Sequence, residues 1–122
     1  MPVQNRPPLI GLVGVCASGK STLSKGLKNF GVNCRHIAQE HSYVPDMWQR
    51  LTRPDILIFL EVSYANTLVR KKLNWTVAEY EEQLYRLRHA REHANLVIDT
   101  NQLTPQEVTD QILKFIDLTE MK

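Results

Sequence analysis

Residues 14–21 constrain the fold of this chain more than any other segment. They read GVCASGKS, with the spacing G-x-x-x-x-G-K-S. An apolar run, residues 8–13, comes directly before them, and a segment of helical pattern, from Ser21 to about Phe30, follows. A glycine-rich turn between a strand and a helix points successive backbone N–H groups inward, as a nest for an anion. The sequence therefore predicts a phosphate-binding loop.

Each position of this loop has a predicted role. Gly14 and Gly19 allow backbone angles that residues with a Cβ resist. The start of the following helix adds free N–H groups and the positive end of its dipole. We expect Lys20 to reach the β- and γ-phosphates, Ser21 to hold Mg²⁺ and Thr22 to approach the α-phosphate. The loop residues predicted to bind the phosphates are Gly14, Val15, Cys16, Ala17, Ser18, Gly19, Lys20, Ser21 and Thr22.

Composition limits the class of protein. The 122 residues are enough for one domain with a core, which we expect to span residues 1–122. A net charge of +2 gives no argument for a nucleic-acid or membrane partner. The longest apolar run, residues 56–60, is too short to cross a bilayer. Residues 1–8 do not have the pattern of a signal sequence, so a cytoplasmic location is the default expectation.

Short apolar runs alternate with longer amphipathic segments, a pattern typical of a parallel sheet covered by helices. The predicted strands are residues 9–13, 33–38, 55–62 and 96–99. The predicted helices are residues 19–29, a short one opening at Pro45, residues 63–72, residues 76–94, and a last one that begins at Pro105. Thr76 and Thr104 each open a capping box. We therefore predict an α/β fold with three layers and a small, mostly parallel sheet of four strands.

The helical segments have predicted buried faces. These are Leu23, Leu27 and Phe30 in the first helix, Val77, Tyr80, Leu84 and Leu87 in the long one, and Val108, Ile112, Phe115 and Ile116 in the last. Cys34 falls in a strand and Cys16 in the loop, which predicts no disulfide. For Cys16 we favour a small loop-filling residue over a sensor of oxidants.

The chain resembles the P-loop nucleoside and nucleotide kinases, most of all the thymidylate-kinase and adenylate-kinase group. The matching segments are residues 14–22, residues 54–62, Arg70, and residues 96–100. The resemblance implies a three-layer α/β/α P-loop NTPase fold, a nucleoside triphosphate with Mg²⁺ as cofactors, and a small phosphoryl acceptor. No N-K-x-D guanine signature is present, which favours ATP over GTP.

The chain departs from these kinases in one respect. They have a further strand beside the strand of the phosphate loop, and a helical region that binds the acceptor. Only residues 39–53 separate the second predicted strand from the third, too few for both. We therefore expect a shortened core with the strand order 2-1-3-4.

Glu40 is the first candidate for chemistry outside the loop. It follows the second strand, and ligands of open α/β sheets bind beyond the carboxyl ends of the strands. The carboxylate is thus placed to approach Mg²⁺ through water, or to accept a proton from an acceptor hydroxyl. A surface glutamate at a strand end is an equally weighted interpretation. For Glu61, which ends the third strand, we favour a structural role.

Arginines supply the other candidates. The resemblance places Arg70 where the related kinases begin their lid, although residues 73–75 leave little lid to close. Arg88 and Arg91 lie one turn apart on the next helix, where they could complete a clamp on the transferred phosphoryl group. Arg86 is expected to pair with Glu82 instead. The resemblance also implies that the loop at Asn101 contacts the adenine.

Two further groups of side chains have no single predicted functional role. The four histidines predict no metal set, although His89 and His93 have a helical spacing that permits one. Tyr43, Met47 and Trp48 cluster around Pro45. They could line an acceptor pocket, cover a sheet edge, or form a contact in a homodimer.

Two functional hypotheses follow. The first is a minimal kinase that uses Mg·ATP, with Lys20, Glu40, Arg70, Arg88 and Arg91 as catalytic residues. The second is a module that binds ATP or ADP, hydrolyses it slowly or not at all, and acts as a sensor or subunit. The missing strand favours the second hypothesis, and the loop and the arginines fit both.

Overall fold

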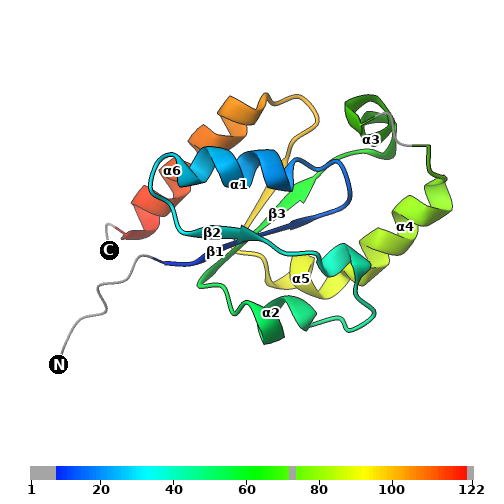
Figure 1. The fold of residues 1–122 in the computed structure, drawn as a ribbon, viewed down its shortest axis with the longest axis horizontal. Helices are drawn as coiled ribbons and strands as arrows, with labels where there is room; N and C mark the ends of the chain where they lie inside the picture. Colours follow the sequence, from blue (N-terminus) through cyan, green and yellow to red (C-terminus); the bar gives the residue numbers. More distant parts are fainter. Residues whose placement is uncertain (1–7, 72–73, 121–122) are drawn as a thin grey trace.

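The computed structural model describes residues 8–71 and 74–120. Its centre is a parallel sheet of four strands: β1 (Ile10–Gly14), β2 (Cys34–His36), β3 (Ile56–Glu61) and β4 (Leu96–Asp99). Their order across the sheet is β2-β1-β3-β4, which confirms the predicted order (Figure 1). No further strand lies beside β1 in the described part of the chain, because β2 and β3 pair directly with it.

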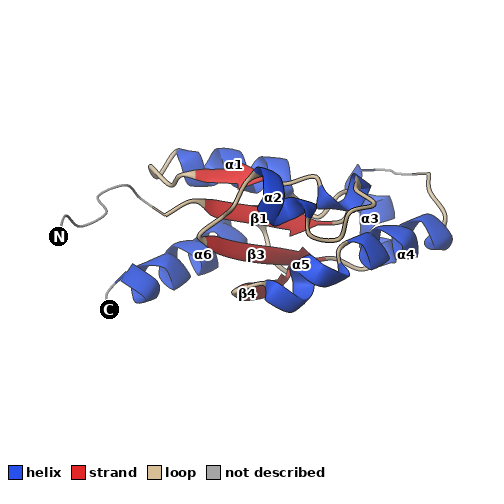
Figure 2. Cartoon of the chain, turned by 90° about the horizontal axis from the view of Figure 1, so that it is seen from below, coloured by secondary structure: helices blue, strands red, loops and turns tan. Residues whose placement is uncertain are grey.

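Helices cover both faces of this sheet. They are α1 (Lys20–Lys28), α2 (Met47–Leu51), α3 (Tyr64–Lys71), α4 (Val77–Arg86), α5 (Arg88–His93) and α6 (Pro105–Glu120), with a 3-10 turn, η1 (Gln39–His41). Figures 1 and 2 show α1 and α6 on one face, and α2 and α5 on the other. The three predicted layers of an α/β P-loop fold are thus present.

The two faces of the sheet have separate cores. Side chains alternate along a strand, so Ile10 and Leu12 of β1 face α1 and α6, whereas Val13 faces the opposite layer. Residues Ile56–Leu60 of β3 are all 6% exposed or less, which confirms a central strand covered on both faces. The α1/α6 layer contributes Leu23, Leu27, Val108, Ile112 and Ile116, and the other layer contributes Trp48, Leu87 and Ala90.

The strand register brings the carboxyl ends of the strands to one edge. Gly14 of β1 lies opposite Leu60 of β3, and Glu61 of β3 lies opposite Asp99 of β4. The glycine-rich loop leaves the sheet at this edge. The described chain begins and ends at the opposite end of the strands (Figure 1).

The predicted helix over residues 76–94 is wrong in one respect, because it is two helices. The chain bends at Leu87, whose N–H is shared between the carbonyls of Gln83 and Leu84. The bend seats Leu87 and Ala90 on the sheet, while α4 extends past the strand ends (Figure 2). The predicted apolar face therefore fails in part: Val77 and Leu84 are exposed, and Gln83 is buried.

Other boundaries differ by a few residues. Phe30 is 60% exposed rather than buried, because α1 ends at Lys28 and the chain turns through Gly31 at a φ of +79°. Helix α2 begins at Met47, two residues after Pro45. Both capping boxes form as predicted, at Thr76 and Thr104. Lys72, where α3 was expected to end, and Leu73 of the short lid lie outside the described residues.

Candidate functional site

The phosphate loop depends on two glycines for different reasons. Gly19 has a φ of +99°, a left-handed conformation that side chains disfavour. Gly14 is required for space instead: a Cβ there would lie 2.7 Å from the carbonyl oxygen of Leu60 and 2.7 Å from Oγ of Ser18. The expectation that both glycines serve unusual backbone angles is therefore correct only for Gly19. Ala17 also has a positive φ, of 68°.

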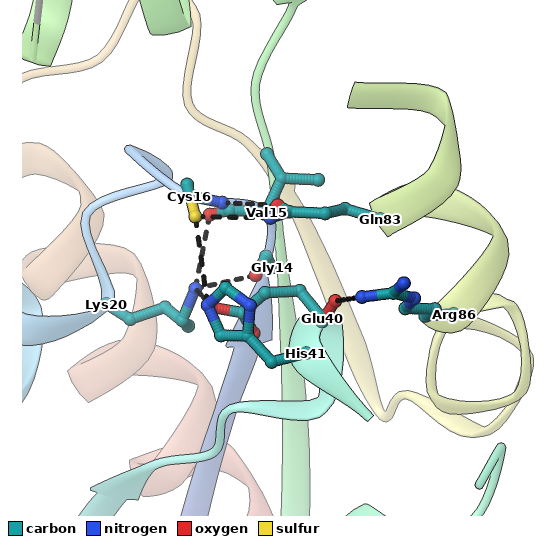
Figure 3. A network of polar contacts seen from close by, with 8 residues as sticks. All are labelled: Gly14, Val15, Cys16, Lys20, Glu40, His41, Gln83 and Arg86. Carbon is teal, nitrogen blue, oxygen red and sulfur yellow. Dashed lines mark hydrogen bonds and ion pairs between the residues drawn. The ribbon is translucent and has the colours of Figure 1, made fainter. Parts of the chain in front are cut away.

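The side chain of Lys20 lies beneath the loop and contacts two loop carbonyls and one carboxylate (Figure 3). Its Nζ donates to the carbonyl oxygens of Gly14, at 2.6 Å, and Val15, at 3.1 Å. The same Nζ forms an ion pair with Oε2 of Glu40 at 3.0 Å, and both side chains are more than nine-tenths buried. Glu40 is therefore not a surface residue, but the partner of the loop lysine.

Two polar atoms in this site have no partner. Oγ of Ser18 and Oε1 of Glu40 are buried and make no hydrogen bond within the described part of the chain. Leaving a buried polar group unpaired costs about 1–3 kcal/mol, so such atoms are expected where a ligand completes the site. Because Ser18 belongs to the glycine-rich loop and Glu40 contacts the loop lysine, the residues present fit a bound phosphate group with its cation.

Gln83 of α4 holds the loop in place and was not among the predicted site residues. The backbone N–H of Cys16 donates to Oε1 of Gln83 at 3.0 Å, and Nε2 of Gln83 lies 3.3 Å from Sγ of Cys16 (Figure 3). A signal was present: Gln83 is spaced three residues after Tyr80 and four before Leu87, both predicted to be buried. A polar residue on a buried face needs a partner.

Gln39 and Arg86 hold the turn that carries Glu40. Gln39 is 1% exposed, accepts a bond from the N–H of Trp48, and donates to the carbonyls of Val44 and Arg86. Arg86 pairs with Glu82 at 3.1 Å, as predicted, and its Nη1 donates to the carbonyl of Glu40. Glu40 thus sits on a segment fixed from both sides.

Arg70 lies at a cavity of about 350 Å³ on the α1/α6 side of β3. Its guanidinium donates to Oγ1 of Thr100 at 3.0 Å, and also to the carbonyl of Thr100. The residues lining this cavity include Ala17, Ser18, Gly19 and Thr22 of the loop region, and Thr100 and Leu103 after β4. The cavity therefore joins the phosphate loop to the loop after the last strand.

Arg88 and Arg91 lie elsewhere. With Tyr80 and Asn101 they line a second cavity, of about 550 Å³, that also reaches Phe59 and Val62 on the α4/α5 side of β3. The structure does not gather the predicted clamp of Arg70, Arg88 and Arg91 at one point. Asn101 likewise lines this second cavity, whereas its neighbour Thr100 lines the first.

The two arginines of the second cavity have protein partners. Arg91 forms an ion pair with Glu61 at 2.6 Å, consistent with the structural role favoured for Glu61. The guanidinium of Arg88 lies 3.8 Å from the ring centre of Tyr85. Burial and the charge of Glu61 raise the pKa of Tyr80, whose hydroxyl donates to the carbonyl of Val62.

The aromatic cluster near Pro45 does not act as a unit. Trp48 is 6% exposed, belongs to the core against β3, and donates through Nε1 to Nδ1 of His89. Tyr43 is 82% exposed, with the Arg86 guanidinium over its ring. Trp48 therefore covers a face of the sheet rather than its edge, and the three interpretations stay predictions for Tyr43 and Met47.

The parallel sheet, its covering helices and the glycine-rich loop together have the fold of P-loop kinases. Among solved structures, this chain is similar to shikimate kinase from Acinetobacter baumannii, solved in complex with shikimate. The TM-score is 0.65 and the identity 17%, over 95% of this chain and 96% of the other. At this identity the likeness establishes the fold. No protein-family model and no curated protein sequence matches the chain.

None of the helices in the described part of the chain is both long enough and apolar enough to cross a bilayer.

Proposed function

We propose that this protein binds Mg·ATP at residues 14–21 and transfers the γ-phosphoryl group to a small acceptor. The observation that carries the proposal is the buried ion pair of Lys20 and Glu40 beneath the glycine loop, beside Oγ of Ser18 and Oε1 of Glu40, which have no hydrogen-bond partner among the described residues. A lysine ammonium held at 3.0 Å from a carboxylate under such a loop is placed for the phosphates of a nucleotide. The kinase-type fold supports the same conclusion.

The nucleoside would occupy the cavity beside Arg70. This cavity of about 350 Å³ opens from the phosphate loop, so it lies where the rest of a bound nucleotide must go. The planar guanidinium of Arg70, held by Thr100, is suited to stack on a base. Since the loop after β4 carries no guanine signature, we propose ATP rather than GTP.

Magnesium would be held by Ser21 and approached by Glu40. Ser21 is exposed in the first turn of α1, and Glu40 has one carboxylate oxygen free. Oxygen ligands and retained water are what Mg²⁺ prefers. When bound, the ion neutralises charge on the phosphates, while Lys20 and the N–H groups at the start of α1 hold them in position.

The acceptor would bind in the cavity lined by Tyr80, Arg88 and Asn101. This cavity shares Leu60 with the nucleotide cavity, so the two spaces lie on either side of the end of β3. Its volume of about 550 Å³ suits a small molecule. Arg88 supplies positive charge for an anionic acceptor, whereas Arg91 is paired with Glu61 and Glu92 also lines the cavity.

The proposal is tested by measuring ADP formation from Mg·ATP, with and without a panel of candidate acceptors. The panel contains nucleosides, nucleoside monophosphates and, because of the structural likeness, shikimate. We expect at least one acceptor to raise the rate well above hydrolysis in water, and Arg88→Ala to raise its KM. A rate that no acceptor changes would support the slowly hydrolysing module instead, and would contradict phosphoryl transfer.

A further inference from the structure

We infer that Cys16, Glu40 and His41 form a binding site for Zn²⁺ beside the phosphate loop. Cys16 comes from the loop after β1, and the other two come from η1 after β2 (Figure 3). One ligand atom from each residue lies within 4.8 Å of the others. The inference does not depend on the proposed function, because it concerns an ion that binds without nucleotide.

The spacing of the ligand atoms is close to that of a tetrahedral zinc centre. Sγ of Cys16 lies 4.0 Å from Nε2 of His41, and Nε2 of His41 lies 3.6 Å from Oε2 of Glu40. Zinc bonds of about 2.0–2.3 Å separate neighbouring ligand atoms by about 3.3–3.8 Å. Rotation of the exposed His41 side chain, with a small shift of the Cys16 side chain, would therefore close the site around an ion.

The chemistry of the three ligands selects the ion. A thiolate, an imidazole nitrogen and a carboxylate oxygen form a mixed set that Zn²⁺ accepts, whereas Mg²⁺ prefers oxygen ligands alone. Three protein ligands leave a fourth position of the tetrahedron open, as in zinc sites that also bind water or another ligand. The site thus differs in ligand chemistry from the Mg²⁺ position at Ser21, and Glu40 borders both.

A second observation points to a ligand in the same place. Oε1 of Glu40 is buried and has no hydrogen-bond partner in the described part of the chain, while Oε2 is shared with Lys20. The carboxylate of Glu40 therefore has unused capacity for a ligand, and Oε2, the oxygen 3.6 Å from His41, is also the one that contacts Lys20. The side chain of His41 is 59% exposed and Cys16 is partly exposed, which leaves an entry path.

Surrounding hydrogen bonds fix the backbone that carries two of the ligands, Cys16 and Glu40. Gln83 fixes the backbone of Cys16, and Gln39 and Arg86 fix the turn that carries Glu40. Such supporting contacts around a metal ligand are as much part of a site as the ligands themselves. The ammonium of Lys20 opposes a second cation nearby, so we expect weaker binding than at a structural zinc site with four protein ligands.

The test uses the full chain, purified without nucleotide and kept reduced. Zn²⁺ is titrated by calorimetry, and Co²⁺ is titrated by visible and near-ultraviolet absorption as a spectroscopic substitute. We expect one equivalent to bind, with a sulfur-to-cobalt charge-transfer band. Cys16→Ser should abolish the band, and His41→Ala should weaken Zn²⁺ binding at least tenfold. Cys34→Ala and His36→Ala serve as matched controls that should change neither result.

Two outcomes would overturn the inference. One is the absence of saturable binding at submillimolar metal by the folded protein. The other is a charge-transfer band, or a Zn²⁺ affinity, that survives both Cys16→Ser and His41→Ala. Circular dichroism of each variant confirms that loss of binding is not loss of the fold.

Discussion

Nζ of Lys20 lies 3.0 Å from Oε2 of Glu40, and the two residues come from elements that follow neighbouring strands of the sheet. Lys20 begins α1 after the β1 loop, and Glu40 lies in η1 after β2. Because β1 and β2 are parallel, both residues emerge at the same edge. The pair therefore connects the phosphate loop to the turn after β2.

Glu40→Gln should abolish the ion pair with Lys20 while nearly preserving the shape of the side chain. It leaves a buried ammonium without its carboxylate, which we expect to lower the free energy of unfolding by about 3 kcal/mol. Turnover with Mg·ATP should be lost, while binding of the phosphates at the loop is largely kept. Urea denaturation and ADP formation measure the two effects.

The matched control is Asp46→Asn, which breaks the surface pair with Arg50 on α2. Exposed pairs contribute about 0–1 kcal/mol, so this variant should unfold nearly as the parent does. Equal losses of stability in the two variants, or unchanged turnover in Glu40→Gln, would contradict the role given to Glu40.

Gln83→Leu should loosen the phosphate loop from α4. The variant removes the acceptor of the Cys16 N–H but keeps the side-chain volume, so we expect a loss of about 1–2 kcal/mol in stability. Hydrogen exchange at the Cys16 amide should accelerate by more than that at neighbouring β1 amides. Gln106→Leu, at an exposed pair with Asp110, is the control and should leave the Cys16 amide protected.

Arg70→Ala should weaken nucleotide binding without disturbing the loop. We expect an affinity for Mg·ATP about tenfold lower, equivalent to about 1.4 kcal/mol, because a charged group beside the nucleoside cavity is removed. Calorimetric titration with Mg·ATP measures the affinity of this variant. The control is Arg50→Ala, because Arg50 pairs with Asp46 at the surface. An Arg70→Ala affinity equal to that of Arg50→Ala would place the base elsewhere.

Tyr80 should make stability depend on alkaline pH. Its ordinary pKa is 10.0, and burial with the charge of Glu61 raises the pKa in the folded state. Between the two values the unfolded chain releases a proton that the folded protein keeps, so stability falls as the pH rises. The stabilisation is fully present below pH 10.0 and is lost through the folded pKa.

Urea denaturation of the parent and Tyr80→Phe, on both sides of pH 10.0, measures this effect. Part of the decline seen in the parent should be absent from the variant. An identical decline in both proteins would show that another group is responsible.

Much of the fold could be predicted from local patterns. The strand β3 is apolar at every position from Ile56 to Leu60, and the boxes at Thr76 and Thr104 mark two helix starts. The strand order followed from the resemblance to the P-loop kinases together with the short gap between β2 and β3. The break at Leu87 could not be predicted, because it depends on how far α4 extends beyond the sheet.

The candidate site was predictable where a motif carries the chemistry. Residues 14–21 have a spacing that few other structures require, and Glu40 could be placed from the strand edge alone. The roles of Gln83 and His41 were not predicted, because each contacts Cys16 from an element far from it in the sequence. The sequence also could not show that Arg70 lies at one cavity and Arg88 and Arg91 at another, because this depends on which face of β3 each helix covers.

The measurement that tests the central claim most directly is the calorimetric titration of Mg·ATP into the parent protein and Lys20→Ala. Lys28→Ala, an exposed lysine at the end of α1, is the matched control. We expect binding of one nucleotide by the parent and by Lys28→Ala, and at least tenfold weaker binding by Lys20→Ala, since a charge-assisted contact to the phosphates is lost. An unchanged affinity in Lys20→Ala, or no binding by the folded parent, would contradict a nucleotide site at this loop.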